Sequence, residues 1–245
     1  VITTIDSKLQ RAANRALRTA LLQYDRRHGF RGAMAKIDLD ALLADADNPD
    51  LQLQEKLNNY PRFEDLRAAI VLTVTKEERG NAEFFLHNIG RLTLPWDRVR
   101  WKRHINDNGI SGDPISTDEM LDPGDIVYLL NTAQGWQLAQ LPEVQGAFVS
   151  LDPFDGATVA MVGGFNYSIN KFNRAEQSSR QPGSSFKPFI YSAALENGFT
   201  AASIINDAPI VVNNSGQEEA WRPENHSNKF YGPTRLREGL VRSMN

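Results

Sequence analysis

The sequence predicts an α+β chain that is built from three successive parts. After residue 7, apolar residues recur with a period of about 3.6, which indicates a first helix. Between residues 68 and 141, short alternating segments are separated by turn signals, which favours a small five-stranded β-barrel or an open sheet. From residue 143 on, a strand hairpin and a further helix are expected. With 245 residues, the chain is long enough for one large or two modest domains with buried cores.

Residues 1–33 are expected to form a strand and a helix. Residues 1–5 alternate like a short strand. Asp6 or Ser7 then opens the helix, and Ser7 with Gln10 fits a capping box. One face of this helix is apolar and consists of Leu9, Ala13, Ala16, Leu17, Ala20, Leu21 and Tyr24. His28-Gly29 supplies the signal that ends it.

Residues 34–142 are expected to form the β-barrel domain. Residues 37–66 are acidic and prone to helix formation, which is typical of a surface excursion. Strands are then expected at residues 70–74, 84–87, 99–101, 126–130 and 136–141. The turns between them lie at Arg79-Gly80-Asn81, Asn108-Gly109, Asp122-Pro123-Gly124 and Gln134-Gly135.

Composition and charge argue against several classes of function. The formal net charge is −3, and the sequence has no long basic stripe of the kind that a nucleic-acid groove requires. The absence of cysteine excludes disulfides and thiolate metal sites. His28, His87, His104 and His226 show no metal-ligand spacing, and no apolar run reaches the roughly eighteen residues of a membrane span. We therefore expect no metal, no organic cofactor and no nucleic-acid partner.

One basic and aromatic cluster runs from residue 96 to residue 103. It contains Trp96, Arg98, Arg100, Trp101, Lys102 and Arg103. A strand pair with a solvated, charged face explains this cluster most simply. A surface for a glycan or a protein partner is the alternative.

Residues 143–245 are expected to open with a hairpin. Residues 147–151 and 158–162 flank Pro153-Phe154-Asp155-Gly156, which is typical of a loop between two strands. Gly163-Gly164 is interpreted as the end of the second strand. The helix that follows this hairpin is expected to pack against the resulting sheet.

A hydroxyl and an amine stand three residues apart where this helix begins, in Pro182-Gly183-Ser184-Ser185-Phe186-Lys187. Residues at this spacing share a helix face, so the Lys187 amine can take the proton of the Ser184 hydroxyl and make it a nucleophile. Pro182 and Gly183 allow the backbone to turn sharply into the helix. Free N–H groups at the helix start favour an oxyanion on an attacked carbonyl. This pattern is typical of acyl transfer.

The same spacing also occurs at a plain buried helix start, and the sequence repeats it in Ser168-Ile169-Asn170-Lys171. That copy lies in a polar stretch with no helical period behind it. After Ser184, in contrast, apolar residues recur at helical spacing until Asn197-Gly198. A hydrolase of the Ser-His-Asp type would need a Gly-x-Ser-x-Gly elbow, which is absent. Of the two copies, Ser184 is therefore the candidate nucleophile, with Lys187 as its base, and a plain buried helix start is the alternative that the spacing alone leaves open.

A second motif, Ser243-Met244-Asn245, changes the interpretation of the first. Together the two motifs resemble those of the penicilloyl-serine transferases, in which Ser-x-x-Lys, Ser-x-Asn and Lys-Thr-Gly form one pocket. Other stretches are similar to the class A penicillin-binding proteins, which combine a glycosyltransferase with a transpeptidase. These stretches are residues 24–32, residues 159–164, Asp152-Pro153-Phe154-Asp155-Gly156, Phe172-Asn173-Arg174-Ala175, Trp221-Arg222-Pro223-Glu224-Asn225 and Tyr231-Gly232-Pro233.

The resemblance implies an OB-like barrel in residues 34–142 and the N-terminal part of a transpeptidase domain in residues 143–245. It also implies a D,D-transpeptidase that cross-links peptidoglycan stem peptides through an acyl-serine intermediate and that β-lactams acylate. In such an enzyme Ser184 would attack the penultimate D-Ala carbonyl and Lys187 would act as the base. Ser243 would relay a proton toward the leaving nitrogen, and Asn245 would hold Lys187 and the substrate amide.

Two features depart from the family pattern. The sequence has no Lys-Thr-Gly, and no part of it resembles the glycosyltransferase domain. We therefore expect an internal piece of a larger protein, with an incomplete transpeptidase sheet and little activity by itself. The single membrane anchor of the family would lie upstream, and the domains would face the periplasm from the inner membrane.

A non-catalytic function is the alternative. In that case the OB-like domain would serve as a module that binds a glycan or a regulatory protein. Reaction of Ser184 with an electrophile, unaffected by changes on the barrel, would separate the two hypotheses.

Overall fold

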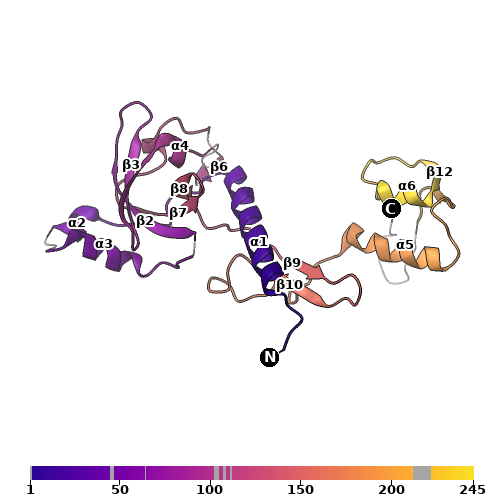
Figure 1. Ribbon diagram of the computed structural model, residues 1–245. Helices are drawn as coiled ribbons and strands as arrows, with labels where there is room; N and C mark the ends of the chain where they lie inside the picture. The colour runs from indigo at the N-terminus through magenta and orange to yellow at the C-terminus, as the bar shows by residue number, and fades with distance from the viewer. Residues whose placement is uncertain are drawn as a thin grey trace, which may run out of the picture. The chain divides into compact units, whose positions relative to one another are not determined.

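A computed structural model of the protein describes residues 2–44, 47–63, 65–101, 105–106, 109–110, 112–211 and 222–245, with backbone alone for 105–106 and 109–110. The chain forms two compact units, Val1–Ser178 and Ser179–Asn245 (Figure 1). Within the described residues, no helix combines the length and the apolar character needed to cross a bilayer.

Helix α1 (Ser7–His28) opens the first unit, and a polar residue caps its start. Asp6 Oδ1 accepts hydrogen bonds from the backbone N–H groups of Lys8 and Leu9 at 2.8 and 2.9 Å. The expected capping box of Ser7 and Gln10 does not form. Instead the Gln10 amide pairs with the backbone of Met161 in strand β10 (Thr158–Val162) at 2.8 and 2.9 Å. The helix start is therefore fixed to the hairpin that follows the sheet.

Residues 2–5 differ from the expected strand. They are assigned no strand, although Thr4 Oγ1 donates to the Thr158 carbonyl at 2.6 Å. The predicted apolar face of α1 is confirmed only in part, because Ala13 and Leu21 are buried while Leu9 and Tyr24 are exposed.

An antiparallel sheet of six strands forms the main body of the first unit. Its strands are β1 (Ala35–Lys36), β2 (Leu66–Val74), β3 (Asn81–Leu86), β4 (Gly90–Pro95), β7 (Asp125–Thr132) and β8 (Gly135–Ala139). The strand order is β1-β7-β2-β3-β4, and β8 also pairs with β7. Since β2 lies along one edge of β7, β1 and β8 share the other edge, where Ile126 faces Ala35 and Tyr128 faces Ala139.

Both faces of this sheet are buried. Alternation along β2 places Ala69 and Val71 in one apolar cluster, which also contains Phe84 and Trp96. It places Ile70 in a second cluster. Short helices α2 (Leu39–Leu43) and α3 (Pro49–Leu57) border the second cluster. The acidic stretch is helical, as predicted, but it is more than a surface excursion because Leu53 and Leu57 are fully buried.

The region between β3 and β7 differs most from the prediction. Strand β4 was not expected, and the strand expected at residues 99–101 is absent. Helix α4 (Trp96–Val99) ends where that strand was expected to begin, and residues 100 and 101 belong to no helix or strand. Trp96, Val99 and Trp101 are buried in the first cluster. A strand pair with a solvated face is therefore the wrong interpretation of residues 96–101. Residues 102–104 and 107–108 lie outside the described residues, next to the short strands β5 (Ile105–Asn106) and β6 (Gly109–Ile110).

The predicted hairpin is confirmed as β9 (Phe148–Leu151) and β10. Ala160 and Val162 of β10 pack against Ala13 of α1. The strand ends before Gly163, where a Cβ atom would come within 2.1 Å of Asn173 Oδ1. Only glycine lets the following loop, which ends at Asn173, fold back onto the strand end so closely.

The second unit contains the expected helix start and helix. A 3₁₀ turn η2 (Gly183–Phe186) leads into α5 (Lys187–Glu196). Asn197 caps α5, and Gly198 follows with a φ of +89°, as Asn197-Gly198 predicted. Strands β11 (Ile204–Asp207) and β12 (Gly232–Arg235) then pair, and α6 (Leu236–Val241) follows. Helices α5 and α6 approach closely, since a Cβ at Gly239 would lie 2.8 Å from the Tyr191 hydroxyl.

Candidate active site

The serine of the Ser-x-x-Lys motif lies in the turn just before α5. Gly183 has a φ of +54°, which a residue with a side chain rarely adopts. The backbone N–H of Lys187 donates to the carbonyl of Ser184 and closes this turn. Pro188 is accommodated because it stands in the first turn of α5, where no backbone N–H is needed. Ser184 is exposed, so its hydroxyl is open to a reagent.

The Lys187 amine contacts three oxygen atoms near residue 245. Its Nζ lies 2.6 Å from the carbonyl oxygen of Ser243, 3.1 Å from Ser243 Oγ and 2.7 Å from Asn245 Oδ1. Partial burial lowers the pKa of Lys187, because desolvation disfavours the ammonium form. A lysine with these properties is suited to give and take a proton.

Ser243 presents two of these oxygens from a turn with unusual backbone geometry. Its φ is +52°, and this left-handed conformation costs a non-glycine residue about 1–2 kcal/mol. The turn is held by the Ser243 and Met244 N–H groups, which donate to the carbonyls of Leu240 and Gly239 at 3.0 and 2.9 Å. Strain of this kind is often found at functional sites, where the surrounding structure enforces it.

Asn225 organises the environment of Asn245. This buried residue donates from Nδ2 to both carboxylate oxygens of Asp207 at 3.0 Å and to the Lys229 carbonyl at 2.9 Å. Its Oδ1 accepts from the Asn245 backbone N–H at 2.7 Å. Asn245 Nδ2 donates in turn to the Glu224 carbonyl at 2.6 Å. A chain of hydrogen bonds thus runs from Asp207 through Asn225 and Asn245 to Lys187.

The sequence argument did not identify Asn225 or Asp207 as parts of the site. Asn225 was noted only as the last residue of Trp221-Arg222-Pro223-Glu224-Asn225, a stretch that resembles the family. No spacing in the sequence connected it with Asp207. Both are buried polar residues. The sequence does not reveal this burial, because an asparagine near a turn is usually exposed.

The structure brings three of the four predicted site residues together by hydrogen bonds, namely Lys187, Ser243 and Asn245. Ser184 stands one turn from Lys187, but its hydroxyl bonds to neither Lys187 nor any other described residue. The repeated motif is different, because Ser168 N–H and Oγ bond to Asn166 Oδ1 in a turn of the first unit. The described residues contain no cluster of three His, Asp or Glu side chains that could hold a metal ion.

Comparison with known families divides the chain between two domain types. Residues 30–144 match the family model of the penicillin-binding protein OB-like domain. Residues 146–245 match that of the penicillin-binding protein transpeptidase domain.

Curated relatives and a solved structure give the same result. The chain is 45% identical over 254 residues to penicillin-binding protein 1A of Vibrio cholerae and 40% identical over 247 residues to that of Pseudomonas aeruginosa, in each case over its full length. A crystal structure of penicillin-binding protein 1A from Haemophilus influenzae superposes with a TM-score of 0.79 at 37% identity, covering 100% of this chain and 34% of that one. The chain spans 30% and 29% of the length of the two curated relatives.

Proposed function

Because this chain belongs to the class A penicillin-binding proteins, with an OB-like and a transpeptidase domain, we propose that it is part of a peptidoglycan synthase that cross-links stem peptides. Attack by a serine on the penultimate D-Ala carbonyl would break the D-Ala–D-Ala amide, form an acyl-enzyme and release the terminal D-Ala. An amine of a neighbouring stem would then displace the serine and form the cross-link. β-Lactams would acylate the same serine. As in the family, the protein would act on the periplasmic side of the inner membrane.

The observation that supports this proposal best is the contact between the two motifs. Lys187 Nζ bonds to Ser243 Oγ and Asn245 Oδ1, although 56 and 58 residues separate them in the chain. A plain helix start would give no reason for a lysine to meet a serine and an asparagine at this separation. The lowered pKa of Lys187 also favours its use as a base at a lower pH than an ordinary lysine would allow.

Each residue then has a role that follows from its position. Ser184 supplies the nucleophilic hydroxyl in the turn that leads into α5. Neutral Lys187 takes its proton. Ser243 Oγ, in contact with Lys187, passes a proton to the leaving nitrogen. Asn245 fixes the lysine through Oδ1 and is itself fixed through Asn225.

Labelling of the full-length protein with a fluorescent penicillin tests the nucleophile. Ser184→Ala should abolish covalent labelling, since no other atom can replace the attacking oxygen. Ser185→Ala and Ser168→Ala are the matched controls and should still label. Persistent labelling of Ser184→Ala would overturn the assignment.

A polypeptide limited to residues 1–245 should acylate far more slowly than the full-length protein. Ser184 is exposed and its hydroxyl has no hydrogen-bond partner within the described residues, so little in the chain positions the nucleophilic oxygen. In the family, the strand with Lys-Thr-Gly supplies one oxyanion donor, and loss of one such donor alone costs about a hundredfold to a thousandfold in rate. Intact-mass spectrometry after incubation with penicillin measures this, and rapid stoichiometric acylation at Ser184 would contradict it.

A further inference from the structure

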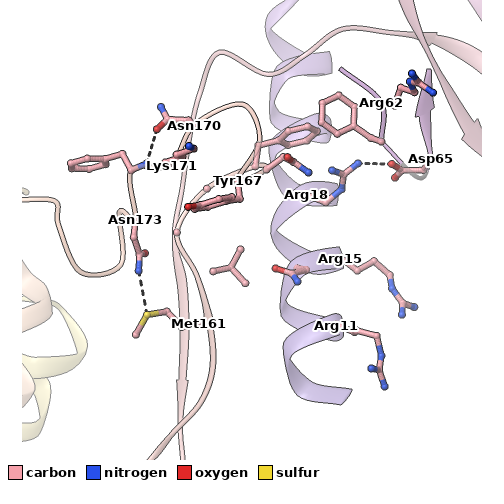
Figure 2. A pocket seen from close by; sticks show the side chains of 18 of the residues that line it. Arg11, Arg15, Arg18, Arg62, Asp65, Met161, Tyr167, Asn170, Lys171 and Asn173 are labelled. Carbon is pink, nitrogen blue, oxygen red and sulfur yellow. Dashed lines mark hydrogen bonds and ion pairs between the residues drawn. The ribbon is translucent and has the colours of Figure 1, made fainter. Parts of the chain in front are cut away.

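A second candidate site lies in the first unit, and the proposed acyl-transfer chemistry uses none of its residues. It is a cleft of about 1110 Å³ between α1, the segment that contains Phe63 and Asp65, and the loop after β10. Figure 2 shows Arg11, Arg15 and Arg18 one above another along α1, with the loop that carries Tyr167 and Lys171 beside the helix. Spacings of four and three residues place the three arginines along one side of the helix.

The described lining of this cleft is basic. Arg18 pairs with Asp65 and lies 4.5 Å from the centroid of the Phe165 ring. Asp65 is the one acidic residue of the described lining, and it is occupied by Arg18. The other cations of the lining, which have no acidic partner among the described residues, are Arg11, Arg15, Arg62 and Lys171. This concentration of positive charge occurs in a chain whose formal net charge is −3.

The loop beside the helix adds further hydrogen-bond donors. Asn166 Oδ1 accepts from the Ser168 N–H, and Asn170 Oδ1 accepts from the Phe172 N–H, both at 2.8 Å. These local bonds occupy the amide oxygens and fix the side chains, whereas each amide NH₂ keeps two donors without a described partner. The cleft therefore suits a ligand that carries carboxylates together with many neutral acceptors.

We propose that this cleft binds the carboxylate-bearing glycopeptide of a peptidoglycan strand, an inference that rests on the proposed function. Arginine forks pair with carboxylates in a bidentate way, and stem peptides carry free carboxylates. The amide donors of Asn166 and Asn170 match peptide carbonyls and sugar hydroxyls. Tyr167, which is 73% exposed, offers an aromatic face for a sugar ring.

The same features disfavour other anionic ligands. Single-stranded nucleic acid is bound along a basic groove in which successive aromatic side chains stack on successive bases. Of the four aromatic side chains in this lining, Phe63 and Phe165 are buried, and only Tyr167 and Phe172 are exposed for stacking. A membrane surface calls for an amphipathic helix whose apolar face is free to enter the lipid, whereas Ala13 and Leu21 on the apolar face of α1 are buried within the first unit. The glycopeptide is therefore the ligand that the lining fits best.

Isothermal titration of the 245-residue chain with a soluble disaccharide-pentapeptide from peptidoglycan tests the proposal. The double variant Arg11→Gln/Arg15→Gln should bind about tenfold to a hundredfold more weakly, because it loses charge-assisted bonds. Lys8→Gln/Lys56→Gln removes the same charge from two exposed positions outside the cleft and should bind like the unchanged chain. A disaccharide-pentapeptide whose carboxylates have been amidated should bind the unchanged chain about as weakly as the unmodified ligand binds the arginine variant.

Three results would overturn the inference. These are no binding of the disaccharide-pentapeptide to the unchanged chain, equal binding by the arginine variant and the lysine control, or tighter binding of a single-stranded oligonucleotide or of phosphatidylglycerol vesicles. The proposed function is tested separately by penicillin labelling of the full-length protein, in which it fails if Ser184 is not acylated. Ser184→Ala should leave the affinity of the cleft unchanged.

Discussion

Each of the two units of this chain is stabilised internally by a different kind of interaction. In the first unit, the sheet buries large apolar side chains on both faces, and Phe84, Leu53 and Tyr128 are at most 1% exposed. In the second unit, α5 has no buried residue, and Phe189 is 68% exposed. What fixes the candidate site there is the polar chain from Asp207 to Lys187.

This difference separates stability from function. Burial of apolar surface is non-directional and tolerates small shifts in position, so it suits a scaffold. Hydrogen bonds have strict distances and angles, so they suit a site in which an amine must meet particular oxygens. Changes in the first unit should therefore affect unfolding, and changes in the second should affect reactivity.

The largest expected effect comes from Lys187. In the full-length protein, Lys187→Ala should slow penicillin acylation by about a hundredfold to ten-thousandfold, the usual contribution of a positioned base. Lys187→Arg keeps the charge but cannot lose its proton, so a similar loss is expected. Lys171→Ala removes the lysine of the repeated motif and should acylate normally. Stopped-flow measurement of acylation gives these rates.

The pH profile provides a sharper test of the same residue. Partial burial lowers the pKa of Lys187, so the neutral amine becomes available at lower pH than for an ordinary lysine. The acylation rate should rise with pH and level off below the ordinary lysine pKa of about 10.4. A rate that still rises through that value would contradict the role of the lowered pKa.

The apolar core of the sheet gives the next largest effect. Phe84→Ala should lower the free energy of unfolding of the sheet by about 3–5 kcal/mol, since the side chain is fully buried. Phe189→Ala on the exposed surface of α5 should change it by less than about 0.5 kcal/mol. Urea denaturation followed by circular dichroism measures both, and equal costs would remove the contrast between the units.

Loss of the Asn225 side chain should have a smaller effect, confined to the second unit. Asn225→Ala removes the bonds to Asp207 and to the Asn245 N–H and leaves buried groups unpaired, at a cost of about 1–3 kcal/mol. The acylation rate should fall while the unfolding of the sheet stays the same. Asn206→Ala, at the exposed neighbouring position, is the control and should react normally.

His87 gives the smallest effect, and it depends on pH. Its Nε2 donates to Asn58 Oδ1 at 2.8 Å, while the buried Nδ1 has no hydrogen-bond partner among the described residues. Burial, followed by the charges of Arg62 and Arg67, lowers its pKa in the folded protein. The unfolded chain then binds the proton more readily, so stability is complete above the ordinary value of about 6.5 and is lost as the pH falls below it.

Thermal melts between neutral and mildly acidic pH measure this loss. His87→Gln should flatten the dependence, because the titrating group is gone. His226→Gln, at an exposed position, should retain it. An unchanged slope in His87→Gln would assign the dependence to other groups.

Periodic segments could be predicted from the sequence, and short segments could not. The repeat behind Ser7 predicted α1, and the turn at residues 153–156 predicted the hairpin. The predicted strand at residues 99–101 was wrong because α4 has only four residues, too few to show a helical period. Strand β4 was missed because Arg91, Thr93 and Pro95 leave few apolar residues in it.

The candidate site was predicted only where motifs have a fixed spacing. Lys187, Ser243 and Asn245 are joined by hydrogen bonds, as the two motifs indicated. The support of this site by Asn225 and Asp207 depends on burial and on the pairing of β11 with β12, which one asparagine in a sequence cannot reveal. The nucleophilic role of Ser184 stays a prediction.

The three contacts of Lys187 also fix the number of protons in the site. An ammonium group has three N–H donors, and here all three meet oxygen acceptors. A neutral amine has only two donors and a lone pair, so one contact must be given up or reversed before the lysine can accept a proton. The contact with Ser243 Oγ is the longest of the three, and a hydroxyl can turn from acceptor to donor, which a carbonyl cannot. The three contacts are those of the charged ammonium. The reactive state is reached only when Lys187 also loses a proton and the Ser184 hydroxyl comes into contact with the amine.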